Sequence, residues 1–512
     1  MTGTRETVAA STPTHDGADL AGQPATRDAA FAAFTRQYPD FDHAALADLR
    51  ARQYARLDAT DQVYLDYTGG GLHGLEQVQA HMAMLTEHVL GNPHSHNPTS
   101  LAMTDRVEHA RAYVLRYFNA DPDEYIVVFT PNASGALKHV AESYPFTPDS
   151  RFVLTFDNHN SVNGMREFAR RAGAQIHYVP LTLPDLRLDL AGMRAALTAD
   201  RPAGNHLLAF PAQSNFSGVQ HSLGLIEEAH AAGWDVMLDA AAFAPTNRLD
   251  LAVVKPDFVS LSFYKIFGYP TGIGALIMRR EAARKLRRPW FAGGTITIAS
   301  VQGDGHYLAD GEVAFEDGTI DYLNLPAVEI GLRHIERVGI DTIHDRVLAL
   351  TGWLLAALPT LRHSNGRPLF KVHGPTDTTA RGATITVSFL DPAGEALDEQ
   401  RIEELAGQAH ISVRTGCFCN PGAGEIAHGL SQGDMCAVFA DGKRMTFDEL
   451  RAHMRDDVHK SVASIRISLG IATNFDDVYR FVEFARGFLD KTAAEVGPPQ
   501  HRDHDVVVRD VV

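Results

Sequence analysis

Short apolar segments alternate with helical segments from about residue 63 to residue 280, and this alternation limits the fold more than any other feature. Segments 124–130 (EYIVVFT) and 235–240 (DVMLDA) are largely apolar, as strands buried on both faces are. Amphipathic segments such as 223–233 (LGLIEEAHAAG) separate them. Because parallel strands need helical crossovers, we expect an α/β fold with a mainly parallel sheet, covered by helices on both faces.

The pattern changes beyond about residue 294, where two long helical segments, 323–339 and 343–358, follow one another. They lead into strand-like segments such as 383–390 (ATITVSFL) and a closing helix at 475–489. We therefore predict a large domain over residues 59–300 and a smaller α+β domain over residues 301–495. The remaining predictions are a disordered leader at 1–28, a helical N-terminal arm at 29–58 and a tail at 496–512.

Composition excludes several classes of partner. The formal net charge of −17 argues against nucleic acid, whose phosphates require clustered Lys and Arg. No apolar stretch approaches the length of a membrane span or a signal peptide, so we expect no membrane partner. Three closely spaced cysteines, too few for a disulfide framework, suit a reducing cytoplasm. A small molecule or another protein is the expected partner.

Two charged residues follow predicted strands, where ligands bind in open α/β sheets. Lys265 comes after an apolar strand and before a glycine-rich turn, although a solvated loop lysine would show the same pattern. Asp239 ends another predicted strand, where its carboxylate could pair with a protonated pyridine nitrogen or cap a helix. Together they indicate a pocket at the sheet edge.

Small residues and a histidine extend this group. Ala133, Ser134 and Gly135 stand where a strand runs into a helix, and a helix N-terminus of this kind suits a phosphate. Ser262, three residues before Lys265, could add a hydroxyl. His159 also follows a strand and could stack its flat ring on a cofactor, or be an ordinary loop histidine.

The order of these motifs resembles the class V aminotransferase and cysteine desulfurase group of fold-type I pyridoxal-phosphate enzymes. Several longer segments resemble the N-terminal domain of molybdenum cofactor sulfurases, and the similarity extends from Gln62 to Phe488; these segments are GNPHSHN, AFPAQSNFSG, SFYKIFGYPTGIGALI, FEDGTI and VRTGCFCNPGA. The resemblance implies a large domain with a seven-stranded type of sheet, a smaller α+β domain, pyridoxal 5′-phosphate as cofactor and a homodimer.

The resemblance also implies roles for individual residues. Lys265 would hold the cofactor covalently, Asp239 would pair with its pyridine nitrogen, and His159 would stack on its ring. Asn215 would contact the ring oxygen or the substrate. The phosphate would be held by three residues of the same chain and one residue of a second subunit. They are Ala133, Ser134, Ser262 and, from the second subunit, Thr295.

The segment VRTGCFCNPGA contains two thiols, and three interpretations of them stay open. They could be buried structural cysteines, or metal ligands, although no paired ligand spacing supports a metal and we predict none. The third interpretation is nucleophilic. Cysteine desulfurases have the spacing R-x-G-x-x-C before the reactive thiol, and Arg414, Gly416 and Cys419 fit it, with Cys417 secondary. A mobile loop would then carry the Cys419 thiolate to the substrate sulfur.

Basic residues suggest how a substrate is bound. Arg466, in a strand-like segment, and Arg414 could each hold a carboxylate through the guanidinium fork, with surface ion pairs as the alternative for both. His94 and His96 could line the substrate pocket or be structural.

The leading hypothesis is a cysteine desulfurase that converts L-cysteine to L-alanine, leaves a persulfide on Cys419 and passes the sulfur to a protein or small-molecule acceptor. A second hypothesis keeps the cofactor but assigns transamination, epimerisation or C–S lysis of another substrate, with Cys419 a bystander. The third is a catalytically silent binding scaffold. The combination of Lys265, Asp239 and His159 argues against the third.

Overall fold

The computed structural model describes residues 26–93, 95–440 and 442–500. These residues belong to two compact units, one ending at Pro39 and the other beginning at Asp40. The first unit contains helix α1 (Arg27–Gln37), capped by Thr26, whose hydroxyl accepts a hydrogen bond from the Ala29 amide. This helix begins inside the predicted leader, whose residues 1–25 lie outside the described part of the chain, as do residues 501–512 of the predicted tail.

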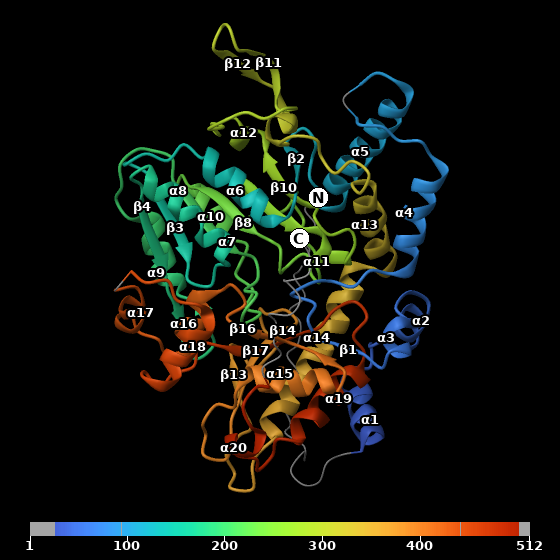
Figure 1. The fold of residues 1–512 in the computed structure, drawn as a ribbon, viewed down its shortest axis with the longest axis vertical. Coiled ribbons are helices and arrows are strands. Elements are labelled where there is room, and N and C mark those ends of the chain that lie inside the picture. The colour runs from blue at the N-terminus through green and yellow to red at the C-terminus, as the bar shows by residue number, and fades with distance from the viewer. Residues whose placement is uncertain (1–25, 94, 441, 501–512) are drawn as a thin grey trace, which may run out of the picture. The chain divides into compact units, whose positions relative to one another are not determined.

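A seven-stranded sheet forms the centre of the second unit (Figure 1). Strand β10 is antiparallel to both of its neighbours, and the other neighbouring pairs are parallel. The predicted mainly parallel sheet is therefore confirmed. Its order is β2 (Tyr125–Thr130), β10 (Gly274–Arg279), β9 (Phe258–Ser262), β8 (Asp235–Asp239), β7 (Leu207–Pro211), β3 (Arg151–Thr155) and β4 (Gln175–Val179).

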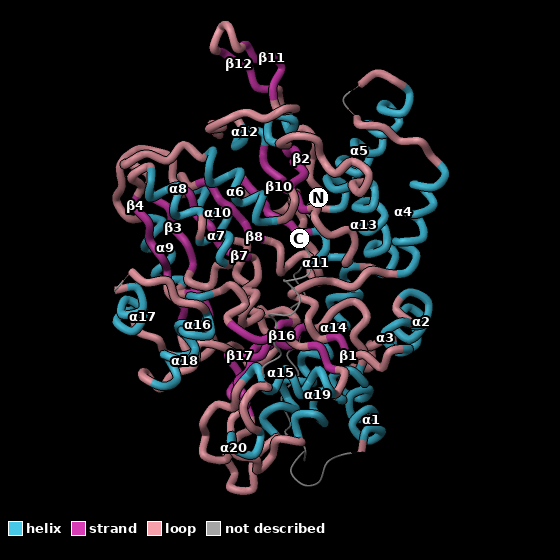
Figure 2. The backbone as a smooth tube through the Cα atoms, in the orientation of Figure 1, coloured by secondary structure: helices cyan, strands magenta, loops and turns pink. Residues whose placement is uncertain are grey.

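Helices cover both faces of this sheet, as the tube drawing in Figure 2 illustrates. On strand β2, Val128 joins the apolar core shared with helices α6 (Ala133–Ser143) and α8 (Met165–Arg171). The adjacent residue, Phe129, contacts Arg111 of α5 (Pro98–Tyr117). Because successive strand residues point to opposite faces, α5 and α6 lie on different sides of β2. Burial on both faces explains why β7, in the interior of the sheet, is apolar throughout, whereas the edge strand β4 carries polar residues.

Further helices complete this region. Helix α13 (Pro326–Val338) packs against both α4 (Leu75–Glu87) and α5. The other helices of this part of the chain are α2 (His43–Gln53), α3 (Arg56–Ala59), α7 (Asn160–Asn163), α9 (Leu190–Thr198), α10 (Leu225–Ala231), α11 (Phe263–Phe267) and α12 (Arg280–Ala283).

A second, four-stranded antiparallel sheet forms the smaller α+β region that the sequence predicts. Its order is β13 (Phe370–His373), β14 (Thr384–Phe389), β17 (Ser464–Ser468) and β16 (Arg414–Gly416). The helices of this region are α14 (Ile340–Ala357), α15 (Glu399–Gln408), α16 (Pro421–His428), α17 (Gln432–Phe439), α18 (Phe447–Asp456), α19 (Phe475–Arg486) and α20 (Ala493–Val496).

One strand differs from the prediction. The predicted alternation of strands and helices begins at about residue 63, but its first strand, β1 (Val63–Tyr64), lies outside the large sheet. It pairs with β15 (Ile411–Ser412), and Asp66 bridges to Ser468 of the smaller sheet. Apolar periodicity identifies a strand but says nothing about a partner almost 350 residues away, which is why the location was wrong.

A projecting hairpin is a feature that the sequence did not predict. Strands β11 (Ile296–Ser300) and β12 (Gly305–Leu308) form it at the top of Figure 1.

Within the described ranges, every helix is too short or too polar to cross a lipid bilayer.

Candidate functional site

Lys265 lies on α11, the short helix that directly follows β9. The helix ends at Gly268, whose φ is +80° and where an added Cβ would lie 2.4 Å from the backbone nitrogen of His73, so glycine is required there. Enclosure by the protein lowers the pKa of the Lys265 amine, and the nearby Asp239 carboxylate partly offsets this effect. The amine therefore loses its proton more readily than an exposed lysine does.

Asp239 ends strand β8 and lines the same cavity as Lys265, a space of about 150 Å³. Its Oδ1 accepts hydrogen bonds from the Ala241 amide at 3.0 Å and from the Ser260 hydroxyl at 3.1 Å. Both bonds use the same oxygen, so Oδ2 remains for a cationic partner in the cavity. The carboxylate is buried, and none of the described helices begins beside it, so it does not serve as a helix cap.

His159 lines this cavity as well and caps α7. Its Nδ1 accepts a hydrogen bond from the Ser161 amide at 3.1 Å, which assigns the ring proton to Nε2 in the neutral form. Burial lowers the pKa of the imidazole, although the Asp239 carboxylate acts in the opposite direction. The ring is thus held in one orientation and is neutral near pH 7.

The predicted phosphate turn lines the cavity where α6 begins. Asn132 caps this helix by accepting a hydrogen bond from the Gly135 amide. The Ser262 hydroxyl accepts from the Ala133 amide at 3.0 Å, and the Ser134 and Ser161 hydroxyls lie 2.6 Å apart. Three of the four predicted phosphate ligands, Ala133, Ser134 and Ser262, are therefore side by side at a helix N-terminus, which attracts anions.

The Cys419 loop is bonded to the wall of this cavity. Asn215 lines the cavity, and its Nδ2 donates to the Phe418 carbonyl at 2.7 Å, so the residue expected to contact cofactor or substrate is bonded to this loop. Cys419 is exposed and close enough to Lys265 and Arg466 to influence the pKa of both. Burial raises the pKa of the Cys417 thiol, which makes Cys417 the poorer nucleophile.

Arg466 lies on β17 and is only 3% exposed. Its Nη2 donates to Asp66 at 3.1 Å and its Nη1 to the Asn215 carbonyl at 3.2 Å, while the buried Nε has no partner among the described residues. Burial lowers the pKa of this guanidinium. A buried cation with an unused donor is a suitable partner for a small anion.

Arg414 faces Arg466 across the strand pair β16–β17 and binds the same carboxylate. Its Nε and Nη2 donate to the oxygens of Asp66 at 2.6 to 3.1 Å. Sequence reasoning missed Asp66, although an aspartate directly after a short strand was a signal. One carboxylate therefore orients both predicted substrate-binding arginines.

Two predicted residues lie apart from the Lys265 cavity within one chain. His96 lines a separate cavity of about 340 Å³, together with Arg111 and Glu316. The Thr295 hydroxyl accepts a hydrogen bond from the Ala292 amide at 2.9 Å in a local turn. Among the described residues of one chain, His96 therefore does not line the Lys265 cavity, where the substrate pocket was expected. His94 lies outside the described residues. Loop residues depend on backbone direction, which the motif GNPHSHN did not specify.

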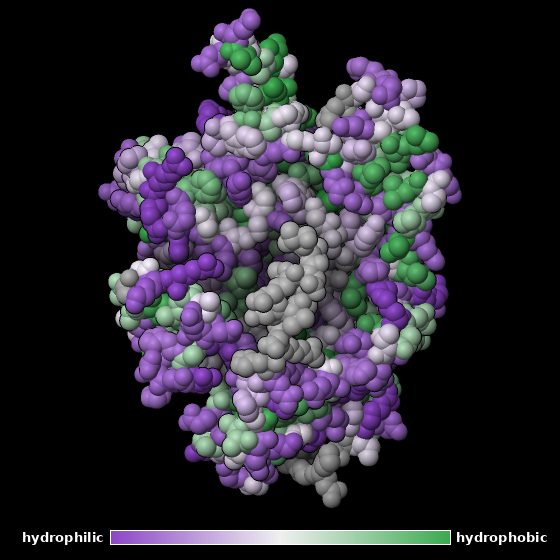
Figure 3. Space-filling view, in the orientation of Figure 1, coloured by the Kyte–Doolittle hydropathy of each residue, from purple (hydrophilic) through white to green (hydrophobic). Residues whose placement is uncertain are grey.

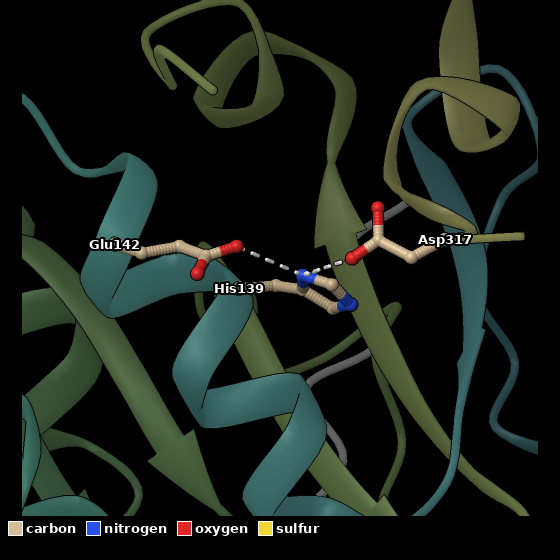
Figure 4. Close-up of side chains that lie close together, drawn as sticks. All are labelled: His139, Glu142 and Asp317. Carbon is tan, nitrogen blue, oxygen red and sulfur yellow. Dashed lines mark hydrogen bonds and ion pairs between the residues drawn. The ribbon is translucent and has the colours of Figure 1, made fainter. Parts of the chain in front are cut away.

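Among the described residues, the side chains that could together ligate a metal are His139, Glu142 and Asp317 (Figure 4). The Arg288 guanidinium already binds all three: it donates to His139 Nδ1 at 2.8 Å, to Glu142 at 3.1 Å and to Asp317. A permanent cation within the group repels a second one, so this cluster is an ion-pair network that joins α6 to the loop after β12.

Comparisons with known proteins agree with this architecture. The chain is 37% identical over 463 residues to molybdenum cofactor sulfurase of Bos taurus, covering 86% of this chain and 51% of that protein. The chain is 35% identical to the protein of the same name in Solanum lycopersicum, and the match covers 85% of this chain and 56% of that protein. The chain thus spans about half the length of these curated relatives.

Solved structures share the fold, and a family model matches most of the chain. The apo structure of a cysteine desulfurase from Thermococcus onnurineus NA1 superposes with a TM-score of 0.71 at 23% identity, covering 86% of this chain and 98% of that one. The cysteine desulfurase CsdA from Escherichia coli superposes with a TM-score of 0.67 at 21% identity, and the match covers 87% of this chain and 99% of that one. The family model described as aminotransferase class-V matches residues 63–481, and the chain belongs to this family.

Proposed function

We propose that this chain is a pyridoxal-phosphate-dependent cysteine desulfurase and sulfurtransferase. The observation that carries the proposal is a single cavity lined by Lys265, Asp239 and His159, with the exposed thiol of Cys419 beside it. The names of the curated relatives, molybdenum cofactor sulfurases, and of the solved structures, cysteine desulfurases, support it.

The residues of the cavity fit the cofactor. Oδ2 of Asp239 would pair with a protonated ring nitrogen, and the N-terminus of α6 with Ser134 and Ser262 would hold the phosphate. His159, neutral and fixed in orientation, would lie against the ring. When bound through Lys265, pyridoxal phosphate acts as an electron sink that stabilises negative charge on the substrate α carbon.

The chain's own groups would carry out the remaining steps. Arg466 would bind the substrate carboxylate through its unused Nε, and Lys265 Nζ, whose lowered pKa favours the neutral amine, would accept the α proton and return a proton to the substrate. The Cys419 thiolate would attack the substrate sulfur. The C–S bond breaks, an S–S bond forms, and the β carbon gains a proton. L-cysteine and a thiol thus become L-alanine and a persulfide without an added oxidant or reductant.

Incubation with L-cysteine tests the proposal. Purified protein supplied with pyridoxal phosphate should release L-alanine, and the peptide that contains Cys419 should gain about 32 Da, the mass of the one sulfur atom held in the covalent intermediate. Mass spectrometry detects both products. A protein that binds no cofactor, or that releases no alanine, would contradict the proposal.

Arg466→Ala is expected to raise KM for L-cysteine by about 10- to 100-fold, because a hydrogen bond to a charged group contributes about 1.5–3 kcal/mol. The affinity for pyridoxal phosphate, followed by visible absorption during titration, should change much less. Arg480→Ala is the matched control, since Arg480 pairs with Asp61 at the surface. An equal loss of cofactor and substrate binding would contradict the role assigned to Arg466.

We also propose a homodimer formed through the hairpin β11–β12. Its side chains Ile298, Val301 and Tyr307 are 59%, 102% and 72% exposed, and Figure 3 shows apolar surface on the hairpin and along α4. Apolar groups gathered on a projecting element favour burial against another protein surface. A second copy is the occupant that the family resemblance supports, and Thr295, next to β11, would then reach the phosphate site of the partner subunit.

The double variant Ile298→Asp/Tyr307→Asp is expected to halve the solution mass, because buried unpaired charges disfavour association. Light scattering after size exclusion measures the mass. Val253→Asp, at an exposed valine outside the hairpin, should leave the mass unchanged. A wild-type protein that is monomeric would contradict the dimer.

We place the reaction in the cytoplasm, with a protein or small-molecule acceptor for the sulfur. The cysteines of the described residues are all free, as a reducing compartment would keep them, and the exposure of Cys419 allows an acceptor to approach its sulfur.

A further inference from the structure

The loop that carries Cys419 is fastened by the side chain of Asn420. This residue is fully buried and caps α16, where its Oδ1 accepts a hydrogen bond from the Ala423 amide at 3.3 Å. Its Nδ2 donates to the Asp157 carbonyl at 2.7 Å and to Asn215 Oδ1 at 2.8 Å. Both amide hydrogens of Asn420 are therefore used to hold the loop to residues that follow strands of the large sheet.

Asn215 extends this connection to the other side of the thiol. Its Nδ2 donates to the Phe418 carbonyl, so the residues before and after Cys419 are both bonded to one side chain of the cavity wall. The Asn160 amide also donates to the Cys419 carbonyl at 2.7 Å. The loop is thus tied at three consecutive residues.

The backbone of the loop requires such ties. Phe418 and Cys419 have φ values of +55° and +54°, in the left-handed region that residues with a Cβ rarely adopt. A conformation of this kind persists only where the surrounding contacts impose it. Without the asparagine hydrogen bonds, the loop would relax toward more favourable backbone angles, and the Cys419 sulfur would move.

We propose that Asn420 is a positioning residue that sets the place of the Cys419 thiol relative to the Lys265 cavity; this inference rests on the proposed function. The amide is required because its NH2 group faces two acceptor oxygens, those of Asp157 and Asn215. Aspartate would cap α16 equally well, but its carboxylate oxygen would face the same two acceptors and repel them. Serine would also cap the helix but would lose both donors.

Two variants separate positioning from capping. Asn420→Asp and Asn420→Ser both keep the cap of α16, and Asn474→Ser is the matched control, since Asn474 caps α19 through the Asp477 amide. In the holoenzyme, both Asn420 variants should form the Cys419 persulfide at least about 30-fold more slowly in a single turnover, because misplacing a reacting group by about 1 Å can cost on the order of 100-fold. KM for L-cysteine and the cofactor absorption should change less than threefold, and Asn474→Ser should match the wild type.

Two further measurements do not depend on turnover. Amide hydrogen exchange in residues 416–420 should become faster in the Asn420 variants, and the pH profile of Cys419 alkylation by iodoacetamide should shift. A wild type that forms no persulfide would contradict the proposed function. In that case, hydrogen exchange and alkylation would still show whether Asn420 holds the loop in place. Variants with wild-type persulfide formation, exchange and alkylation would overturn the inference.

Discussion

Replacing Lys265 with alanine is expected to abolish the turnover of L-cysteine, with kcat at least about 1,000-fold lower. Under the proposed function, the change would remove both the covalent attachment of the cofactor and the amine that moves the α proton, and proton transfer alone contributes roughly 100- to 10,000-fold. Alanine release gives the rate. Borohydride reduction followed by peptide mass spectrometry should locate the cofactor on Lys265 in the wild type and on no peptide in the variant.

Lys255→Ala is the control for this experiment, because Lys255 pairs with Glu124 at the surface. It should retain wild-type turnover and the labelled Lys265 peptide. Cofactor attached to another lysine, or turnover that survives in Lys265→Ala, would contradict the assignment of the site.

Replacing Cys419 with serine should give the second large effect. Persulfide on the protein should disappear, and sulfur transfer should fall at least about 100-fold, since a hydroxyl cannot form the S–S bond and is a far weaker nucleophile at neutral pH. The variant should still bind cofactor and L-cysteine. Persulfide-specific labelling with peptide mapping is the measurement.

Cys417→Ser is the matched control two residues away. Because burial raises the pKa of the Cys417 thiol, this variant should keep at least half of the wild-type rate. Unchanged sulfur release in Cys419→Ser would instead favour the alternative in which the cofactor site acts on another substrate and Cys419 is a bystander.

The sequence predicted the parts of the molecule that depend on local signals. The α/β fold, the mainly parallel sheet and the family are confirmed, because each strand and helix is encoded by its own periodicity. Lys265, Asp239 and His159 could be found because each lies at or just after the end of a strand, and the ends of parallel strands meet at one edge. Their roles and the domain boundaries at 59, 301 and 496 stay predictions.

The missed features depend on contacts between distant residues. Asp66 lies 348 and 400 residues from Arg414 and Arg466, and Asn420 lies 205 residues from Asn215. No local pattern states that such side chains will meet. For the same reason, the sequence predicted the reactive loop but not the hydrogen bonds that hold it.

The shared carboxylate of Asp66 has an electrostatic consequence for substrate entry. The group of two guanidiniums and one carboxylate carries a net positive charge in a protein whose formal net charge is −17. At physiological salt the surface charges are screened within about 8 Å, so this local charge acts only on molecules that have already entered. An amino acid, which is a neutral zwitterion near pH 7, carries no net charge for the acidic surface to repel and presents its carboxylate to the two arginines at short range, whereas an anion of higher charge is repelled once it comes within about 8 Å of the surface.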